Sequence, residues 1–126
     1  MRRKVLIIES EPSISNLLYV LLGGLNYIGE LAPSGAQALA MIRRESFDAI
    51  LMDLRCSAVA AEQLVSRIME IRPNLLGRVL VITGEIEDPK IMDFIERKCL
   101  PHVSQKRMME DVYQSLRAML ELSPQT

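Results

Sequence analysis

The sequence is poor in the residue types that build protein metal centres, and it has no excess of charge of either sign. It contains one histidine, His102, and two cysteines, Cys56 and Cys99. One histidine excludes a multi-histidine metal site. The two cysteines lack the close spacing of zinc ligands, so we expect both thiols to be reduced. The 15 Lys and Arg residues nearly balance the 16 Asp and Glu residues, giving a net charge of -1, which argues against electrostatic binding of nucleic acid by the domain as a whole.

No apolar run is long enough to span a membrane or to form the core of a signal peptide. The first run, Val5 to Ile8, is far shorter than the roughly 20 residues of a membrane helix. There is no internal repeat and no low-complexity segment. With 126 residues, 49% of them apolar, the chain can form one domain with a sizeable core. We therefore expect a single cytoplasmic domain over residues 1–122 and a short tail over 123–126.

Short apolar runs alternate with stretches of helical periodicity along the whole chain. The runs predict strands at 4–8, 28–31, 49–52, 79–82 and 102–104. Signals for helix starts and ends lie between the runs, namely Pro12, Gly23-Gly24, Ser34 with Gln37, Pro73 and Asp88-Pro89. Strand and helix therefore alternate five times, which predicts one parallel sheet with helices on both faces, a doubly wound (βα)5 fold.

The spacing of apolar residues also predicts which side of each helix faces the sheet. In the first helix these residues are Ile14, Leu17, Leu18 and Leu21, and in the last helix they are Met109, Val112, Leu116 and Met119. We expect these positions to be buried.

Polar residues follow four of the predicted strands where each strand ends. They are Glu9, Ser10 and Glu11 after the first, Asp53 after the third, Thr83 and Gly84 after the fourth, and Gln105 after the fifth. Ligands of open parallel sheets bind beyond the carboxyl ends of the strands, so a site is expected here. Carboxylates gathered at one edge repel one another unless a proton or a cation lies between them. A hard divalent ion such as Mg²⁺ suits oxygen ligands of this kind.

These residues resemble the receiver domains of bacterial response regulators. Leu6 to Pro12 (LIIESEP) looks like the receiver segment in which an apolar strand ends in an acidic pair. Asp53, in LMDLR, looks like the phosphoacceptor, and Thr83 follows thirty residues later with the small Gly84 behind it. The resemblance covers essentially the whole chain and implies a flavodoxin-like fold. It also implies a two-component signalling domain and not an enzyme, with a histidine kinase or phosphotransfer protein as donor and a downstream protein as target.

Several positions depart from the family pattern. Receivers usually carry two Asp residues after the first strand, where this chain has Glu9 and Ser10, and their Lys-Pro pair aligns here with Gln105-Lys106. Glu9 and Asp53 remain as metal ligands, so we expect weak Mg²⁺ binding. Glu9 fits equally well as an acid favoured by the dipole at a helix start. In an extended segment Lys106 would point away from Gln105, which makes it a poor substitute for the family's Lys.

Further residues are expected to flank Asp53. Arg55 and Glu85 lie two residues beyond Asp53 and Thr83, so we predict that they face each other across the mouth of the site. His102 occupies the family's aromatic switch position. Receivers often associate through the last strand and the helices beside it, which suggests a homodimer through that surface.

Three functions fit these residues. The first is a phosphorylatable receiver with Asp53 as acceptor, and the second is a pseudo-receiver that uses the same fold for protein interaction without phosphorylation. The third is a small-ligand or flavin-binding domain, which needs a phosphate cradle after the first strand. Glu9 and Glu11 would repel a phosphate there. Formation of an acyl-phosphate on Asp53 separates the first two.

Overall fold

The structure, a computed structural model, describes residues 2–53, 58–84 and 89–120. The strands are β1 (Lys4–Ile8), β2 (Ile28–Ala32), β3 (Ala49–Asp53), β4 (Val79–Thr83) and β5 (His102–Ser104). The helices are α1 (Pro12–Gly24), α2 (Gly35–Arg44), α3 (Ala58–Ile71), α4 (Pro89–Arg97) and α5 (Met108–Leu120). Two short 3₁₀ turns, η1 (Pro73–Leu75) and η2 (Gln105–Arg107), precede β4 and α5. The predicted tail over 123–126 and the predicted cap Asp88 lie outside the described residues.

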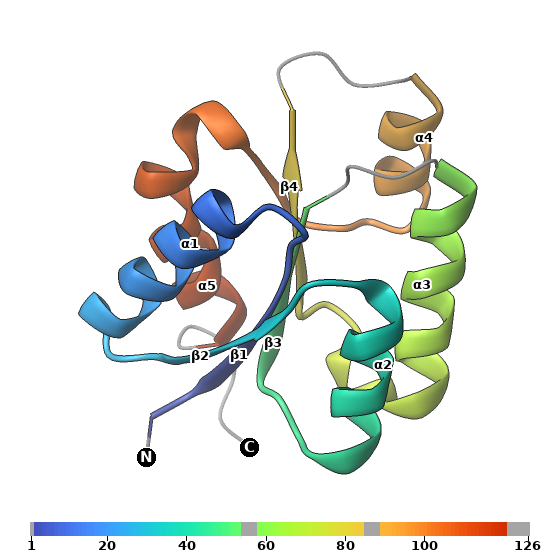
Figure 1. The fold of residues 1–126 in the computed structure, drawn as a ribbon. Helices are drawn as coiled ribbons and strands as arrows, with labels where there is room; N and C mark the ends of the chain where they lie inside the picture. The colour runs from blue at the N-terminus through green and yellow to red at the C-terminus, as the bar shows by residue number, and fades with distance from the viewer. Residues whose placement is uncertain (1, 54–57, 85–88, 121–126) are drawn as a thin grey trace.

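All neighbouring strands pair in parallel, in the order β2-β1-β3-β4-β5. Helices α1 and α5 cover one face of the sheet, and α2, α3 and α4 cover the other (Figure 1). The core has two layers accordingly, because successive side chains of each strand point to opposite faces. The largest buried side chains include Leu51 in β3 and Phe94 in α4. The predicted doubly wound (βα)5 fold is confirmed.

The ends of the helices follow from local sequence, with one difference from expectation. Ser34 caps α2, because its hydroxyl accepts a hydrogen bond from the backbone N–H of Gln37 at 3.2 Å. Helix α1 runs through both residues of the Gly23-Gly24 pair and ends only at Gly24. The left-handed residue that turns the chain is Asn26, with φ of 67°. Asn tolerates this conformation better than most residues, so it supplies the turn that the glycine pair was expected to supply.

The buried faces of α1 and α5 differ slightly from the predicted ones. Met109 is 47% exposed, and the buried residue at the start of α5 is Met108. Leu17 of α1 is 40% exposed, whereas Leu18 and Leu22 are buried. The other predicted residues of α5, Val112, Leu116 and Met119, are buried as expected, and so is Leu18 of α1. No helix in the described part of the chain is long and apolar enough to cross a membrane.

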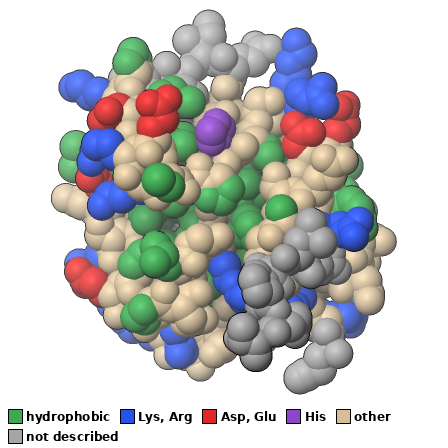
Figure 2. Space-filling model, turned by 180° about the vertical axis from the view of Figure 1, so that it is seen from behind, with side chains coloured by type: hydrophobic (Ala, Val, Ile, Leu, Met, Phe, Trp, Pro, Cys, Tyr) green, Lys and Arg blue, Asp and Glu red, His purple; other side chains and the backbone are tan. Residues whose placement is uncertain are grey.

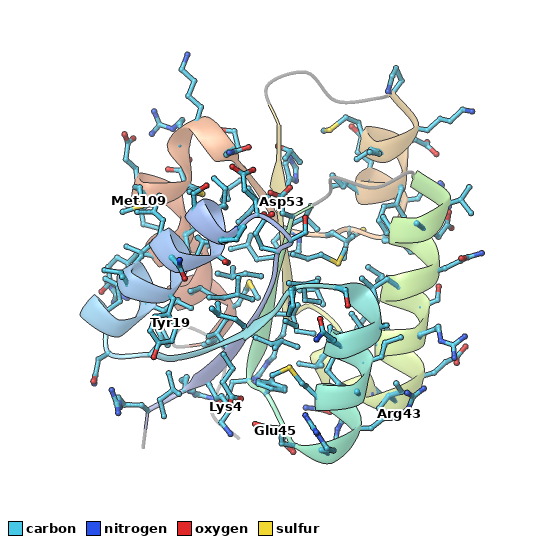
Figure 3. All side chains as sticks on the ribbon, in the orientation of Figure 1. Lys4, Tyr19, Arg43, Glu45, Asp53 and Met109 are labelled. Carbon is cyan, nitrogen blue, oxygen red and sulfur yellow. The ribbon has the colours of Figure 1, made fainter. Side chains whose placement is uncertain are left out.

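Charged residues join the elements at the edge of the sheet where the strands begin. The Nζ atom of Lys4 donates a hydrogen bond to Oε1 of Glu45 at 2.9 Å and lies 4.0 Å from Oε2 of Glu30 (Figure 3). A hydrogen bond between the Glu30 and Glu45 carboxyl groups, together with burial of Glu30, raises the pKa of Glu30. The same hydrogen bond, with that from Lys4, lowers the pKa of Glu45. Of the two carboxyl groups, Glu30 therefore binds a proton more readily than Glu45.

The substitution Glu30→Gln is expected to make the domain slightly more stable near neutral pH. The pKa of Glu30 is raised in the folded state, so its contribution to stability is complete below the pKa it has in the unfolded chain. This contribution is lost as the pH rises through the folded-state pKa. Gln keeps a neutral hydrogen-bond donor at every pH. The free energy of unfolding of Glu30→Gln should therefore exceed that of the unmodified chain at neutral pH, and the difference should vanish below about pH 4.

Denaturant unfolding at a series of pH values measures this effect. Glu70→Gln removes the same charge from an exposed position of α3 and serves as the matched control. A stability difference between Glu30→Gln and the unmodified chain that stays constant from acid to neutral pH would contradict the raised pKa of Glu30.

Candidate functional site

The predicted polar residues gather where the strands end. Asp53 is the last residue of β3 and is half-buried, at the opposite end of the sheet from Lys4 (Figure 3). Strands β1 and β3 are in register with Ile8 beside Met52, so the next residues along, Glu9 and Asp53, are neighbours. The parallel sheet thus brings two carboxylates together from adjacent strands.

A hollow of about 150 Å³ opens beside this pair of carboxylates. Its lining consists of Ile8, Glu9, Ser10, Pro33, Ser34, Gly35, Met52, Asp53 and Leu64. The contribution of 33–35 was not predicted from the sequence. The signal was present, because these residues follow β2, whose carboxyl end lies at the same edge as those of β1 and β3.

Glu9 is a buried acid with an unused oxygen. Its side chain is only 5% exposed, and one oxygen, Oε1, accepts a hydrogen bond from the backbone N–H of Glu11 at 2.9 Å. The other oxygen, Oε2, is buried and has no hydrogen-bond partner among the described residues. A buried carboxylate oxygen without a partner is costly, which favours a bound cation at this point. The hydrogen bond from Glu11, the residue before α1, fits the predicted acid at a helix start, and the buried Oε2 fits the predicted metal ligand.

Thr83 ends β4 and is 6% exposed. Its hydroxyl donates a hydrogen bond to the carbonyl oxygen of Val103 in β5 at 3.4 Å. This distance is long for a bond between two oxygens, so the interaction is weak. Asp53 is paired with Ile82, which places Thr83 one residue beyond the partner of Asp53 in the neighbouring strand. The half-buried Gly84 follows Thr83.

Gln105 begins the 3₁₀ turn η2 directly after β5 and is half-buried. The segment is therefore not extended, and the expected alternation of Gln105 and Lys106 is wrong. In a 3₁₀ turn successive side chains point about 120° apart. Lys106 is nevertheless exposed and does not line the hollow. The half-buried position after β5 thus carries a neutral amide.

His102 lies away from the carboxylates. It pairs with Val81, two residues before Thr83, and its side chain is exposed. Figure 2, which views the molecule from behind, shows this histidine (purple) at the surface. Its Nδ1 lies 3.3 Å from the carbonyl oxygen of Leu100. The predicted flanking residues Arg55 and Glu85 lie outside the described residues, so their facing arrangement stays a prediction.

Within the described ranges, no three acidic, histidine or cysteine side chains gather closely enough to hold a metal ion by themselves. The site therefore consists of the pair Glu9 and Asp53, with the Ser10 hydroxyl beside them at the hollow. Two carboxylates with a water-accessible opening can hold Mg²⁺, which commonly keeps several water ligands.

Comparison with known proteins identifies the family. The family model of the response regulator receiver domain matches residues 5–117. The chain therefore belongs to the response regulator receiver domain family, and it is a domain of two-component phosphorelay signalling. It is 25% identical over 122 residues to sporulation initiation phosphotransferase F of Bacillus subtilis, covering 97% of both chains.

Other relatives are longer than this chain. The transcriptional regulatory protein GlrR of Escherichia coli is 30% identical over 84 residues, which is 67% of this chain but 19% of that protein. The chain thus spans about a fifth of the length of such relatives.

Solved structures share the fold. The chemotaxis protein CheY4 of Vibrio cholerae superimposes with a TM-score of 0.81 at 19% identity, covering 95% of this chain and 100% of that one. The receiver domain of the sensor histidine kinase PA1611 of Pseudomonas aeruginosa has magnesium coordinated in its active-site cleft. It superimposes with a TM-score of 0.79 at 18% identity, covering 94% of this chain and 98% of that one.

Proposed function

We propose that this domain accepts a phosphoryl group on Asp53 from a histidine kinase or phosphotransfer protein, and that it does so less readily than receivers with the full set of charged groups. The observation that supports this proposal is the neighbouring position of Asp53 and buried Glu9 at one hollow. Among the described residues, Oε2 of Glu9 has no hydrogen-bond partner there. In this role the domain is a cytoplasmic signalling domain and not an enzyme.

The carboxylate pair fits a weakly bound Mg²⁺. Glu9 and Asp53 would hold the ion, and water would supply the remaining ligands. When bound, Mg²⁺ neutralises negative charge on a transferring phosphoryl group. The Ser10 hydroxyl, in the position of the family's second Asp, is neutral and a weaker ligand than a carboxylate. Asp53 itself supplies the oxygen that attacks phosphorus, and the donor's nitrogen leaves.

Among the described residues at this edge, the position after β5 carries the neutral amide of Gln105. Gln105 can donate only a neutral hydrogen bond, and charge-assisted hydrogen bonds are roughly twice as strong. Transfer of a phosphoryl group depends mainly on positioning and on neutralising charge. The loss of one acid at Ser10 and of one ammonium at Gln105 therefore reduces catalysis without preventing folding.

Thr83 offers a route by which phosphorylation reaches the surface. Its weak hydrogen bond to the Val103 carbonyl can be exchanged for a charge-assisted bond to a phosphoryl oxygen. That exchange removes one link between β4 and the short strand β5. The surface around β5, which includes the exposed His102, would then change for a downstream protein.

The phosphoryl donor must reach Asp53 from the edge where the strands end. Exposed apolar side chains lie on the two helices of one face, Leu17 at 40% on α1 and Met109 at 47% on α5. Met109 lies toward the same end of the molecule as Asp53 (Figure 3). We propose that the donor protein contacts this surface.

The test is treatment of the purified domain with a small phosphodonor such as acetyl phosphate and Mg²⁺. Intact-mass spectrometry should show one added phosphoryl group that is labile in base, as an acyl-phosphate is. Asp53→Asn should remove it, while Ser66→Ala, on the exposed face of α3, should leave it unchanged. If neither the phosphodonor nor a histidine kinase labels Asp53 at any Mg²⁺ concentration, the domain is a pseudo-receiver and the proposal is wrong.

A further inference from the structure

A second hollow lies between α3, the turn before β4 and the turn before β5. Its volume is about 300 Å³, and its lining consists of Val65, Ser66, Met69, Leu76, Gly77, Lys98, Cys99 and Leu100. Gly77 lies shortly before β4 and Leu100 shortly before β5, so the hollow is at the edge of the sheet where the strands begin. Asp53 ends its strand at the opposite edge. This hollow is therefore separate from the site of Glu9 and Asp53.

The walls of the second hollow are mainly apolar. Val65 and Leu100 are buried, and Met69 packs against the same core layer, between the sheet and the helices α2, α3 and α4 (Figure 1). Leu76 is 77% exposed, more than any other large apolar side chain in the described part of the chain. Sites for small molecules have mainly apolar walls and volumes from about 300 Å³ upward. A small ligand with an apolar part therefore fits this hollow, and it would remove the surface of Leu76 from water.

Backbone hydrogen bonds fix the turn that follows α4 on one side of the hollow. The N–H of Leu100 donates to the carbonyl of Ile95 at 3.0 Å, and the N–H of Cys99 donates to the carbonyl of Glu96 at 3.2 Å. This pair of bonds defines a Schellman turn, in which the residue after the helix is left-handed, and Cys99 has φ of 51°. The turn holds 98–100 beside the hollow. The hollow is thus formed before a ligand binds, which lowers the entropy lost on binding.

A single charged residue, Lys98, stands among the residues that line this hollow, and none of the lining residues that the structure describes is acidic. Lys98 is exposed, and its ammonium group has no ion pair or hydrogen bond with any described residue. Its neighbour Arg97, by contrast, contacts Asp93 at 2.8 Å and Glu62 at 3.4 Å. An anionic group at the rim of the hollow can therefore pair with Lys98, whereas a cationic group would be repelled.

We propose that this hollow binds a small amphipathic anion, of the class of medium-chain carboxylic acids. The hydrocarbon part of the ligand lies against Val65, Leu76 and Leu100. Its carboxylate lies at the rim, beside the ammonium group of Lys98. The ligand contacts both α3 and the turn after α4, so it joins two neighbouring helices of one face. Binding uses neither Asp53 nor a metal ion, and it does not depend on phosphorylation.

Titration of the whole chain with octanoate and with octylammonium, followed by nuclear magnetic resonance of the backbone amides, tests the proposal. The two probes have hydrocarbon chains of the same length and opposite charges. Octanoate should bind saturably and shift the amide signals of 65–69, 76–77 and 98–100. Octylammonium should bind about fivefold more weakly or worse, because it loses the ion pair with Lys98.

Variants separate the charged rim from the apolar walls. Lys98→Gln should remove the preference for octanoate, and Lys98→Glu should reverse it. Lys90→Glu makes the same change in charge near the start of α4, away from the hollow, and should leave the preference unchanged. Leu76→Ser should weaken both probes about threefold or more, because it removes apolar surface from the wall. Circular dichroism checks that each variant is folded.

The proposal is overturned if the unmodified chain binds neither probe at millimolar concentrations, or binds both equally well. It is also overturned if octanoate shifts the signals of other residues instead of those that line the hollow. A preference for octanoate that Lys98→Glu leaves intact, or that Lys90→Glu changes as much, places the anion elsewhere and overturns it too.

Discussion

The double substitution Ser10→Asp with Gln105→Lys is expected to raise both Mg²⁺ affinity and the rate of phosphorylation at Asp53. The new carboxylate adds a strong metal ligand next to Glu9 and Asp53. The new ammonium supplies a cation that can neutralise charge on the transferring phosphoryl group. We expect Mg²⁺ affinity to rise about tenfold or more, and the phosphorylation rate to rise about 10- to 100-fold. Titration of Mg²⁺ and timed labelling by a small phosphodonor measure the two effects.

The single variants separate the contributions. Ser10→Asp should act mainly on Mg²⁺ affinity, and Gln105→Lys mainly on the rate of labelling. Glu9→Gln, which keeps the size of the side chain but removes its charge, should lower Mg²⁺ affinity. If the unmodified chain already binds Mg²⁺ and is labelled as readily as receivers with the full set of groups, the interpretation fails. Lys106 or Glu11 must then supply the charges that Gln105 and Ser10 lack.

The substitution Leu51→Ala is expected to lower the free energy of unfolding by about 2–5 kcal/mol. Leu51 lies in the central part of β3 and is fully buried, packed in the layer between the sheet and helices α1 and α5. Removing its methyl groups loses their burial and leaves a cavity that a closely packed layer fills only partly. Because domains are stable by about 5–15 kcal/mol, the loss is a large part of the total. Urea denaturation followed by circular dichroism measures it.

Leu76→Ala provides the matched control for this loss. Leu76 is 77% exposed, so the same deletion should change the free energy of unfolding by less than about 0.5 kcal/mol. Equal losses for the two variants would contradict the burial of the β3 core. If phosphorylation of Asp53 in Leu51→Ala falls by more than the fraction of folded protein does, the packing of β3 also positions Asp53 directly.

Local sequence patterns predicted most of the fold. Four-residue apolar runs such as that ending at Ile8 predicted strands buried on both faces, and proline positions such as Pro12 and Pro89 predicted the helix starts. These signals are local, because burial requires a particular period of apolar residues and proline restricts its own backbone. Single positions of α1 and α5 were predicted less well, as Leu17 and Met109 show. Several apolar residues follow one another there, and only packing against the sheet selects which are buried.

The sequence alone determined that carboxylates follow the first and third strands and that neutral residues stand at Ser10 and Gln105. It could not decide which of these groups meet. Register between β1 and β3 made Glu9 and Asp53 neighbours, and burial left Oε2 of Glu9 without a hydrogen-bond partner in the part of the chain that the structure describes. The parallel sheet also brought 33–35 to the same hollow and left β2 as an open edge. These features depend on hydrogen bonds and contacts between residues far apart in the chain, whereas sequence patterns report only the preferences of neighbouring residues.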